Sequence, residues 1–279
     1  MLSATIPETV RRLLAAQPIE LPIFHPVALK LQKMLSDYDF TVAEVALVAN
    51  EDMSLASQML KIANSPMYMG RSKVATIKEA VIRLGAQQVI NLVIAASQVA
   101  VHSSSNPALN HYMKQLWLHS HGCALGAKWL AHSCGMRGVA DETYLAALLH
   151  DVGKLYLLKS IERLVGVGVI SSMLDDELIL EIFEVMHVEQ GHRLMQHWNF
   201  PTIYCDVVRD HHVDEWDTVN KMLTIVRFAN LACRRIGLGM KHDPSLVLIS
   251  TPEAENLGLD EIQIFELEAM LAESRDAEL

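Results

Sequence analysis

The most informative stretch of this sequence is Ala146–Leu155, which reads Ala-Ala-Leu-Leu-His-Asp-Val-Gly-Lys-Leu. It places a histidine and an aspartate, His150 and Asp151, side by side at the end of an apolar helix. An imidazole nitrogen and a carboxylate oxygen on consecutive residues can both reach one borderline cation, which accepts mixed nitrogen and oxygen ligands. For an isolated His–Asp pair, the competing interpretation is a helix end with a core histidine and a solvated aspartate.

Histidines on other predicted helices favour the metal interpretation. Of the 13 histidines, 12 lie from His102 onward, and only His25 precedes that position. The candidates lie on an earlier helix, on a later helix and at the end of a helix that begins near Pro201. They are His119 and His121, then His187, then His211 and His212. We therefore expect the chemistry to lie in the C-terminal half.

The apolar residues recur at helical spacing along almost the whole chain, and no stretch alternates apolar and polar residues as a strand does. The predicted fold class is all-α. Thr41 and Thr76 stand where helix N-caps are expected. The polar segment 102–107 separates two predicted helical lobes, residues 1–104 and residues 105–279, of which the second carries the histidines and ends in an acidic helix.

The composition restricts the partners and the compartment. Acidic residues outnumber basic ones, with a net charge of −10, so we expect no nucleic-acid partner. The most apolar stretch, 89–101, is interrupted by polar residues and shorter than the roughly 20 residues of a membrane span, so we expect no membrane insertion. The four cysteines lie among apolar neighbours without a C-x-x-C pair, as buried reduced thiols do. Together with the absence of a secretory signal, this predicts a cytoplasmic protein.

The motifs around these histidines resemble those of the HD superfamily of metal-dependent phosphohydrolases. The resemblance rests on Trp117–Ser120, on Leu149–Lys154, on His187 with Gly191, and on the pair His211-His212. Their order is similar to that of the HD-GYP phosphodiesterases, which act on cyclic di-GMP.

The N-terminal half resembles the HDOD domain, the HD-related output domain. This second resemblance rests on Leu21-Pro22 with His25–Ala28, on Leu60–Tyr68 and on Ala80–Gly85. The two resemblances together cover about residues 15 to 235. They imply an all-helical bacterial signalling output of a kind that usually lacks demonstrated catalysis.

The resemblance assigns roles to individual residues. It places His119, His150 and Asp151 in one metal cluster, and a second cluster comprises His187, His211 and His212, with Asp151 able to bridge the two. Asp151 and Lys154 are the predicted catalytic residues, and Lys154 would face a substrate phosphate. We expect all six ligands to line one cavity, with His121 and His132 outside it.

The chain departs from the enzyme pattern at three places. Asn230 stands where HD hydrolases have a final aspartate ligand, and Gln115 stands where some HD-GYP enzymes have a glutamate. No Gly-Tyr-Pro segment follows His212, and we expect Val213–Trp216 to lead straight into the next helix. With fewer carboxylates the site should bind a divalent metal (Fe, Mn, Mg or Ni) weakly or not at all.

Two hypotheses about function follow. The preferred one is a signal-transduction module that acts through a signalling protein partner, with a degenerate HD-type pocket for metal, nucleotide or phosphate. The alternative is an active metal-dependent phosphohydrolase acting on a nucleotide or cyclic dinucleotide. Because residues 1–279 contain no receiver, kinase or cyclase segment, we expect the input to arrive through another chain.

Overall fold

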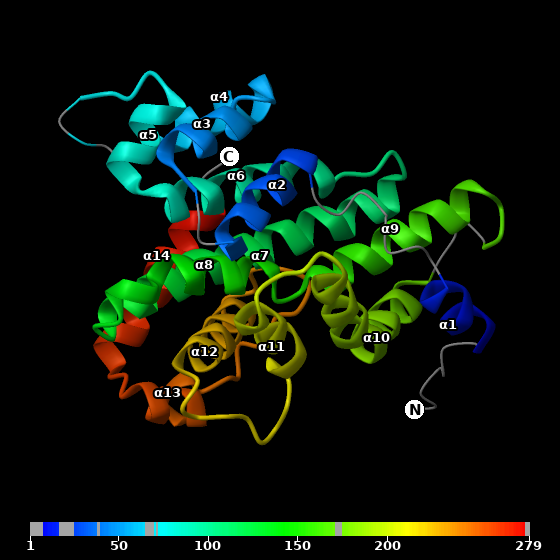
Figure 1. Ribbon diagram of the computed structural model, residues 1–279. Helices are drawn as coiled ribbons and strands as arrows, with labels where there is room; N and C mark the ends of the chain where they lie inside the picture. The colour runs from blue at the N-terminus through cyan, green and yellow to red at the C-terminus, as the bar shows by residue number, and fades with distance from the viewer. Residues whose placement is uncertain are drawn as a thin grey trace. The chain divides into compact units, whose positions relative to one another are not determined.

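The computed structural model describes residues 8–16, 25–37, 40–64, 70, 72–170 and 175–276. The regular secondary structure in these ranges consists of α-helices and two short 3₁₀ turns, and no strand occurs among them (Figure 1). The all-α prediction is confirmed. In the part of the chain described, no helix combines the length and the apolar character needed to cross a membrane.

The chain folds into two compact units, which we call the N-terminal unit and the C-terminal unit. The N-terminal unit comprises residues 22–101 together with 198–201. A hydrogen bond from Gln32 Nε2 to the carbonyl oxygen of Asn199, at 3.3 Å, joins its two segments. Its helices are α2 (Pro26–Asp37), α3 (Val42–Ala49), α4 (Met53–Ala63), α5 (Ile77–Leu84) and α6 (Ala86–Val101).

Side-chain caps define the helix starts of the N-terminal unit. The Thr41 hydroxyl accepts from the Glu44 backbone N–H at 3.2 Å, and the Glu44 carboxylate accepts from the Thr41 N–H at 2.7 Å. These reciprocal bonds form a capping box. Thr76 caps α5 by accepting from the Glu79 N–H at 3.1 Å. Both predicted N-caps are confirmed.

The C-terminal unit contains the remaining helices. They are α1 (Glu8–Ala15), α7 (Pro107–Ser133), α8 (Ala140–Leu149), α9 (Val152–Gly166), α10 (Asp176–His197), α11 (Thr202–Asp210), α12 (Lys221–Arg235), α13 (Pro252–Leu257) and α14 (Glu261–Asp276). Two short 3₁₀ turns, Arg137–Val139 and Leu248–Ser250, complete it. The predicted lobe boundary at residue 104 stays a prediction; in the structure the units divide after Val101, and α1 belongs to the C-terminal unit.

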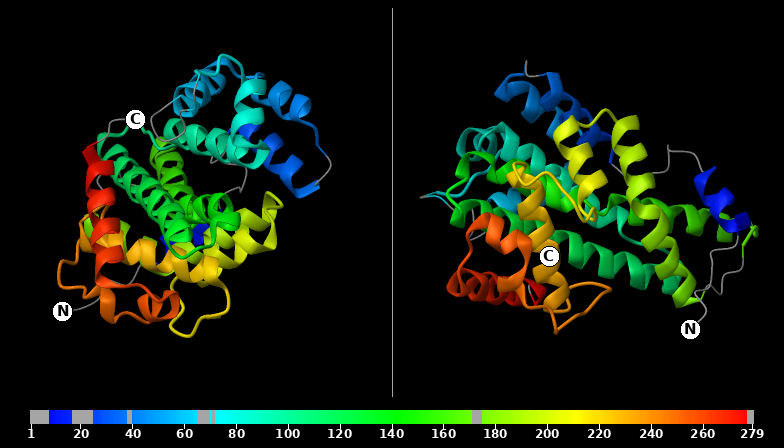
Figure 2. Two further views of the ribbon diagram at one scale, coloured as in Figure 1. Left: turned by 90° about the vertical axis from the view of Figure 1, so that its left-hand side faces the viewer. Right: turned by 90° about the horizontal axis from the view of Figure 1, so that it is seen from below.

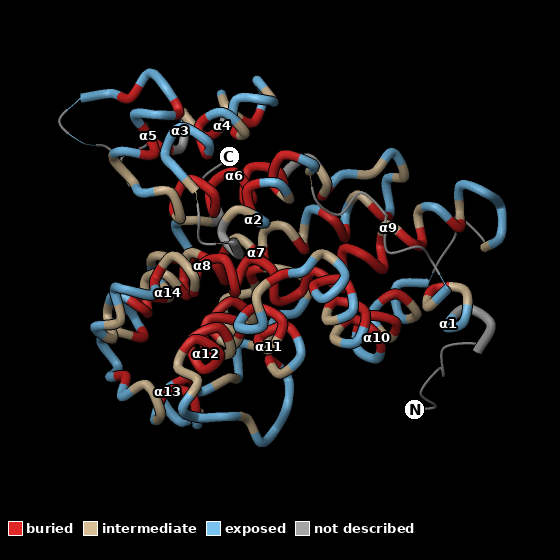
Figure 3. Tube along the Cα trace, viewed as in Figure 1, coloured by how far each residue is buried: buried red, intermediate tan, exposed pale blue. Residues whose placement is uncertain are grey.

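Helix α7 is the central element of the C-terminal unit. It packs most extensively on α8 and α12, and it also contacts α9 and α14, while α10 lies against α9 and α11 (Figures 1 and 2). Buried residues concentrate along α7, α8 and α12 (Figure 3). The Asn106 side chain caps α7 by accepting from the Ala108 N–H at 3.0 Å, and Pro107 occupies the first turn, where its missing N–H costs nothing.

Helices α9 and α10 approach each other closely at two glycines, Gly153 and Gly191. A Cβ added to Gly153 would lie 1.9 Å from the carbonyl oxygen of His187 and 2.7 Å from the backbone nitrogen of Gly191. No side chain fits there, so the two backbones touch. This contact brings the start of α9, where Asp151 lies, directly against His187.

Gly153→Ala should therefore destabilise the protein severely. The added methyl must push α9 and α10 apart, and overpacking of this kind costs about 1–3 kcal/mol or more. Gly166→Ala at the end of the same helix is the matched control, because a Cβ there would meet no atom within 4 Å; it should be neutral or stabilising by up to about 1 kcal/mol. Chemical denaturation of both variants measures the difference, and equal stabilities would contradict the close contact.

Candidate metal centre

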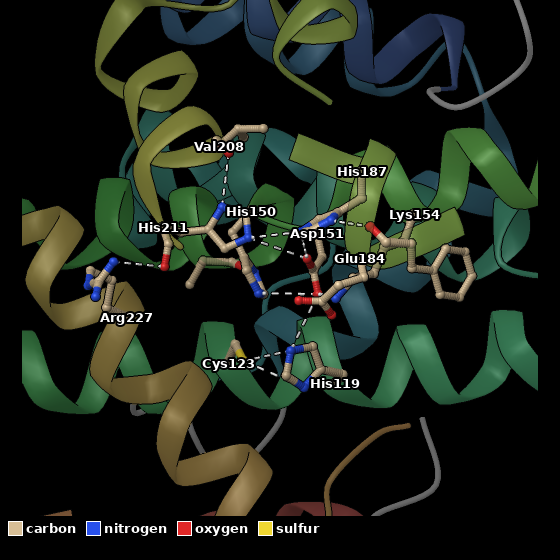
Figure 4. Close-up of polar contacts among 12 residues, drawn as sticks. His119, Cys123, His150, Asp151, Lys154, Glu184, His187, Val208, His211 and Arg227 are labelled. Atoms are coloured by element: carbon tan, nitrogen blue, oxygen red, sulfur yellow. Dashed lines mark hydrogen bonds and ion pairs between the residues drawn. The ribbon is translucent and has the colours of Figure 1, made fainter. Parts of the chain in front are cut away.

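The predicted ligands come from separate parts of the C-terminal unit and meet at Asp151. His119 lies on α7, and His187 lies on α10. His150 is the C-cap of α8 and Asp151 is the N-cap of α9, so the two residues form the junction between these helices. His211 follows the last residue of α11. Figure 4 shows these side chains gathered around the carboxylate.

Four imidazoles face the Asp151 carboxylate at similar distances. The Nε2 atoms of His119 and His150 lie 3.5 and 3.4 Å from Asp151 Oδ2. The Nε2 atoms of His187 and His211 lie 3.5 and 3.6 Å from Asp151 Oδ1. Each carboxylate oxygen therefore faces two rings, and the structure brings together both predicted clusters with Asp151 between them.

Backbone carbonyls fix the orientation of all four rings. The Nδ1 atom lies 3.0 Å from the Leu238 oxygen in His119 and 2.9 Å from the Val208 oxygen in His211. In His150 and His187 it approaches the carbonyl oxygens of Ala147 and Phe183, at 2.6 and 2.5 Å. A carbonyl oxygen only accepts, so each Nδ1 must carry the proton and each Nε2 must present a lone pair. This is the arrangement of metal-ligating histidines.

Burial keeps the rings of His119, His150 and His187 neutral. It lowers the pKa of His150 to about 3 and that of His187 to about 4, and it lowers the pKa of His119 as well. The nearby Asp151 opposes this shift in each case without outweighing it. At neutral pH the Nε2 lone pairs of these three rings are therefore free of protons, as metal ligation requires.

Asp151 stays ionised although its side chain is only 1% exposed. Burial raises the pKa of this carboxyl, but the ammonium of Lys154 lowers it, and the pKa lies well below its usual range. Lys154 Nζ lies 2.5 Å from Oδ2. The predicted phosphate-facing lysine is thus paired with the aspartate.

The donor atoms fit a divalent cation. His150 Nε2 and Asp151 Oδ1 are buried and have no hydrogen-bond partner among the described residues. The Nε2 atoms of His187 and His211, both lone-pair bearers, lie only 3.3 Å apart. Two such atoms repel unless a positive charge lies between them, so the geometry favours a cation at this position.

The donors form two sets that meet at Asp151. One consists of Asp151, His187, His211 and the exposed His212, and their ligand atoms lie within 4.8 Å of one another. The other consists of His119, Cys123 and His150, within the same limit. Sequence reasoning did not single out Cys123 as a ligand. The signal available was its position four residues after His119, which places both on one face of a helix.

A small pocket of about 40 Å³ opens above the centre. It is lined by Lys154, by Asn230 and by three of the six predicted ligands, His119, His187 and His212. His150, Asp151 and His211 lie beneath it without lining it, so the expectation that all six ligands line this one cavity is wrong. Its other polar lining residues, which the motifs did not indicate, are Glu184, Arg234 and Lys241. Glu184 pairs with Lys241 at 2.6 Å, and the buried Arg234 Nε has no partner among the described residues.

The segment after His212 differs from expectation. It does not lead straight into a helix, because α12 begins only at Lys221. Arg227 of α12 holds the intervening loop, because its Nη1 donates to the carbonyl oxygens of His211 and Val213 at 3.1 and 2.8 Å. Its Nε donates to Glu253 at 2.9 Å. Its guanidinium lies over the Trp216 ring, 4.1 Å from the ring centroid. The segment that carries His211 and His212 is therefore anchored, which the motifs did not reveal.

Two histidines lie apart from the pocket, where they were expected. His121 stacks on Trp117 with ring centroids 5.1 Å apart. His132 lies on the last turn of α7. Neither residue lines the pocket.

A sequence model of the HDOD domain family matches residues 21–213. This chain belongs to the HDOD family. The match includes all six predicted ligands and ends before Asn230. An uncharacterised protein from Treponema pallidum (strain Nichols) is 24% identical over 221 residues, which are 77% of this chain, and the match covers only 42% of that relative. The chain thus spans less than half the length of this curated relative.

Solved structures share the HDOD fold of this chain. An HDOD domain protein of unknown function from Geobacter sulfurreducens has a TM-score of 0.73 at 24% identity, with 96% of this chain and 95% of that chain covered. A protein from Shewanella amazonensis SB2B, provisionally classed as a metal-dependent phosphohydrolase, has 0.70 at 19%, with 96% and 97% covered. A Marinobacter aquaeolei VT8 protein, provisionally classed in signal transduction, has 0.67 at 20%, with 96% and 63% covered.

Replacing Lys154 by methionine should make the HDOD chain depend on a metal for stability. Without the ammonium, Asp151 is a buried carboxylate lacking its cationic partner, a loss that costs about 3–5 kcal/mol. A divalent cation can replace the missing charge. We expect Lys154→Met to unfold at lower denaturant concentration than the parent in chelator, and to recover most of the loss in saturating Mn²⁺.

Lys159→Met is the matched control for this variant. Lys159 lies on the same helix, is equally exposed at 14%, and pairs with Glu162 three residues along at 3.1 Å. Lys159 belongs to neither donor set and does not line the pocket. Mn²⁺ should therefore stabilise Lys159→Met no more than the parent. An equal response of Lys154→Met and Lys159→Met to Mn²⁺ would show that no cation replaces Lys154 beside Asp151.

Asn230→Asp should raise the affinity for Mn²⁺. The amide brings no negative charge, whereas carboxylate count is a main determinant of affinity for hard cations. Asn and Asp have nearly the same shape, so the buried site needs no repacking. We expect a gain of about tenfold or more, which is about 1.4 kcal/mol, in a calorimetric titration with His150→Ala as the blank. An unchanged affinity would show that Asn230 does not stand at the missing aspartate.

Proposed function

We propose that this HDOD chain is a regulatory module of signal transduction that binds a divalent cation at Asp151 and acts through a protein partner, without efficient phosphate-ester hydrolysis. Membership of the HDOD family and the likeness to a protein classed in signal transduction support the regulatory part. The histidine and aspartate donors support the metal part.

One observation carries the metal-binding proposal. The Nε2 atoms of His119, His150, His187 and His211 surround one buried carboxylate at 3.4–3.6 Å, and each ring is oriented by a backbone carbonyl. Holding four lone pairs against an ionised aspartate is costly in a dry interior unless a cation compensates. Lys154 supplies one positive charge, and a divalent ion would supply two.

The charges at the centre argue against efficient hydrolysis. Two-metal phosphohydrolases hold their ions about 3.5–4 Å apart so that both the attacking and the leaving oxygen are stabilised. Among the described residues, Asp151 is the only carboxylate in the two donor sets, Glu184 of the pocket is paired with Lys241, and Asn230 adds no charge. Two divalent ions would meet too little negative charge to bind well together. One bound ion is therefore the occupancy that we propose.

The pocket above the centre suits a small anion. Its volume of about 40 Å³ has room for a few water molecules, at about 10–15 Å³ for each, and not for a dinucleotide. Three cations line it: Lys154 is paired with Asp151 and Lys241 with Glu184, whereas the buried Arg234 Nε has no partner among the described residues. A phosphate group, free or at the tip of a nucleotide, is the ligand that we propose here.

The alternative is a working metal-dependent phosphohydrolase. The six ligand-type residues and the cations of the pocket favour it, as does the likeness to a protein classed as such a hydrolase. The uncharged Asn230 and the pairing of Lys154 with Asp151 favour the regulatory proposal.

Metal content and turnover, measured on the same samples, separate the two functions. The full chain is stripped of metal, loaded with Mn²⁺, Fe²⁺ or Mg²⁺, and incubated with phosphomonoesters and phosphodiesters. We expect Mn²⁺ or Fe²⁺ to bind near one ion per chain, and to be lost in His150→Ala and Asp151→Ala, because both remove buried donors. Hydrolysis should not exceed that of these two variants.

His132→Ala is the matched control, since this histidine lies outside the pocket and should leave metal binding unchanged. Turnover that disappears in both His150→Ala and Asp151→Ala would overturn the regulatory proposal in favour of the hydrolase. Metal binding that survives both variants would overturn the proposed centre.

A further inference from the structure

Cys123 lies inside the centre rather than beside it. It follows His119 by four residues on α7, its side chain is fully buried, and its Sγ is 3.6 Å from His119 Nε2 (Figure 4). Since the Nδ1 of His119 already donates to the Leu238 carbonyl, the Nε2 near the sulfur bears the lone pair. The sulfur thus lies next to a free donor nitrogen.

Three of the six separations in a four-ligand site of His119, Cys123, His150 and Asp151 have values that suit tetrahedral coordination. Zinc bonds of about 2.0–2.1 Å to nitrogen and 2.3 Å to sulfur place neighbouring ligand atoms about 3.3–3.7 Å apart. The observed separations are 3.6 Å from Cys123 Sγ to His119 Nε2, 3.5 Å from that nitrogen to Asp151 Oδ2, and 3.4 Å from His150 Nε2 to the same oxygen. The unpartnered, buried His150 Nε2 belongs to the same set as Cys123 and His119.

A thiolate at Cys123 would supply the negative charge that Asn230 lacks. Asp151 alone gives this half of the centre one negative charge, which leaves a divalent ion half neutralised. A cysteine that loses its proton to solvent as the ion binds contributes the second charge, because a coordinating thiol is deprotonated outright. Thiolate sulfur also changes the preference among metals, since soft ligands select zinc over manganese or magnesium.

We propose that Cys123 is a metal ligand, and that His119, Cys123, His150 and Asp151 form a zinc-preferring site. This inference rests on the proposed metal-binding function and deepens it, by naming the ligand and the class of ion. The second set, Asp151 with His187, His211 and His212, has no sulfur donor, so the preference for zinc would come from the first set. The alternative is a structural role, in which Cys123 only packs in the core and forms its hydrogen bond with Cys233.

Cobalt as a spectroscopic substitute for zinc tests this ligand. The full chain is stripped of metal, kept reduced with a phosphine and titrated with Co²⁺, whose thiolate complexes show sulfur-to-metal charge-transfer absorption in the near ultraviolet. We expect this band in the parent and its displacement by Zn²⁺. Cys123→Ser should lose the band and bind Zn²⁺ at least about tenfold more weakly, while its affinity for Mn²⁺, to which thiolate sulfur contributes less, should fall by a smaller factor.

Cys233→Ser is the matched control, because it makes the same change at the neighbouring buried cysteine, which is outside both donor sets. It should keep the band. A band lost in Cys233→Ser and kept in Cys123→Ser would overturn the assignment. Co²⁺ bound without any charge-transfer band would also overturn it, yet leave the proposed function standing if binding still requires His150 and Asp151.

Zinc-edge X-ray absorption of the unmodified chain covers the case in which Cys123→Ser fails to fold. One Zn–S distance of about 2.3 Å together with nitrogen or oxygen ligands at about 2.0–2.2 Å is expected. A shell of nitrogen and oxygen alone would overturn the thiolate ligand. Failure of the parent to bind Zn²⁺, Co²⁺ and Mn²⁺ alike would refute both this inference and the metal-binding function.

Discussion

The ionised carboxylate of Asp151, buried at the junction of α8 and α9, is the interaction on which the C-terminal unit depends. A buried charge without compensation is among the costliest features a fold can contain. Here the ammonium of Lys154 and four imidazoles surround it. Helices α7, α8, α9 and α10 and the end of α11 must therefore be held together, because each delivers one of these groups.

Pre-organisation of the centre comes mainly from backbone carbonyls. Three of the rings are held by carbonyls three or four residues earlier in their own helices, namely those of Ala147, Phe183 and Val208. The fourth, His119, depends on Leu238 from a distant part of the chain. The next residue, Gly239, has φ +119° and lies against His119, because a Cβ added to Gly239 would be 2.7 Å from the Cβ of His119. The 238–239 segment thus positions a ring on α7 by direct contact.

The contact between Lys154 and Asp151 links metal binding to the pocket. The lysine lines the pocket and also neutralises the carboxylate. In the function that we propose, a cation bound beside Asp151 would take over the second task and leave the ammonium available to an anion in the pocket. Occupancy of the centre and of the pocket would then favour each other, which is the coupling that a regulatory module needs. The anchored loop at Arg227 keeps His211 and His212 in place meanwhile.

The sequence by itself determined the helical class, the caps at Thr41 and Thr76, and the set of histidines that meet at Asp151. Helical periodicity and capping are local, and the spacing of the motifs carried the ligand set through a family resemblance. Only the tertiary structure decided that Cys123 faces His119 within the centre, that Lys154 turns to Asp151, and that Arg227 anchors a loop where a direct run into a helix was expected. These features depend on how side chains from different helices pack and on which charged groups are buried next to each other. The spacing of residues along one helix does not determine such contacts.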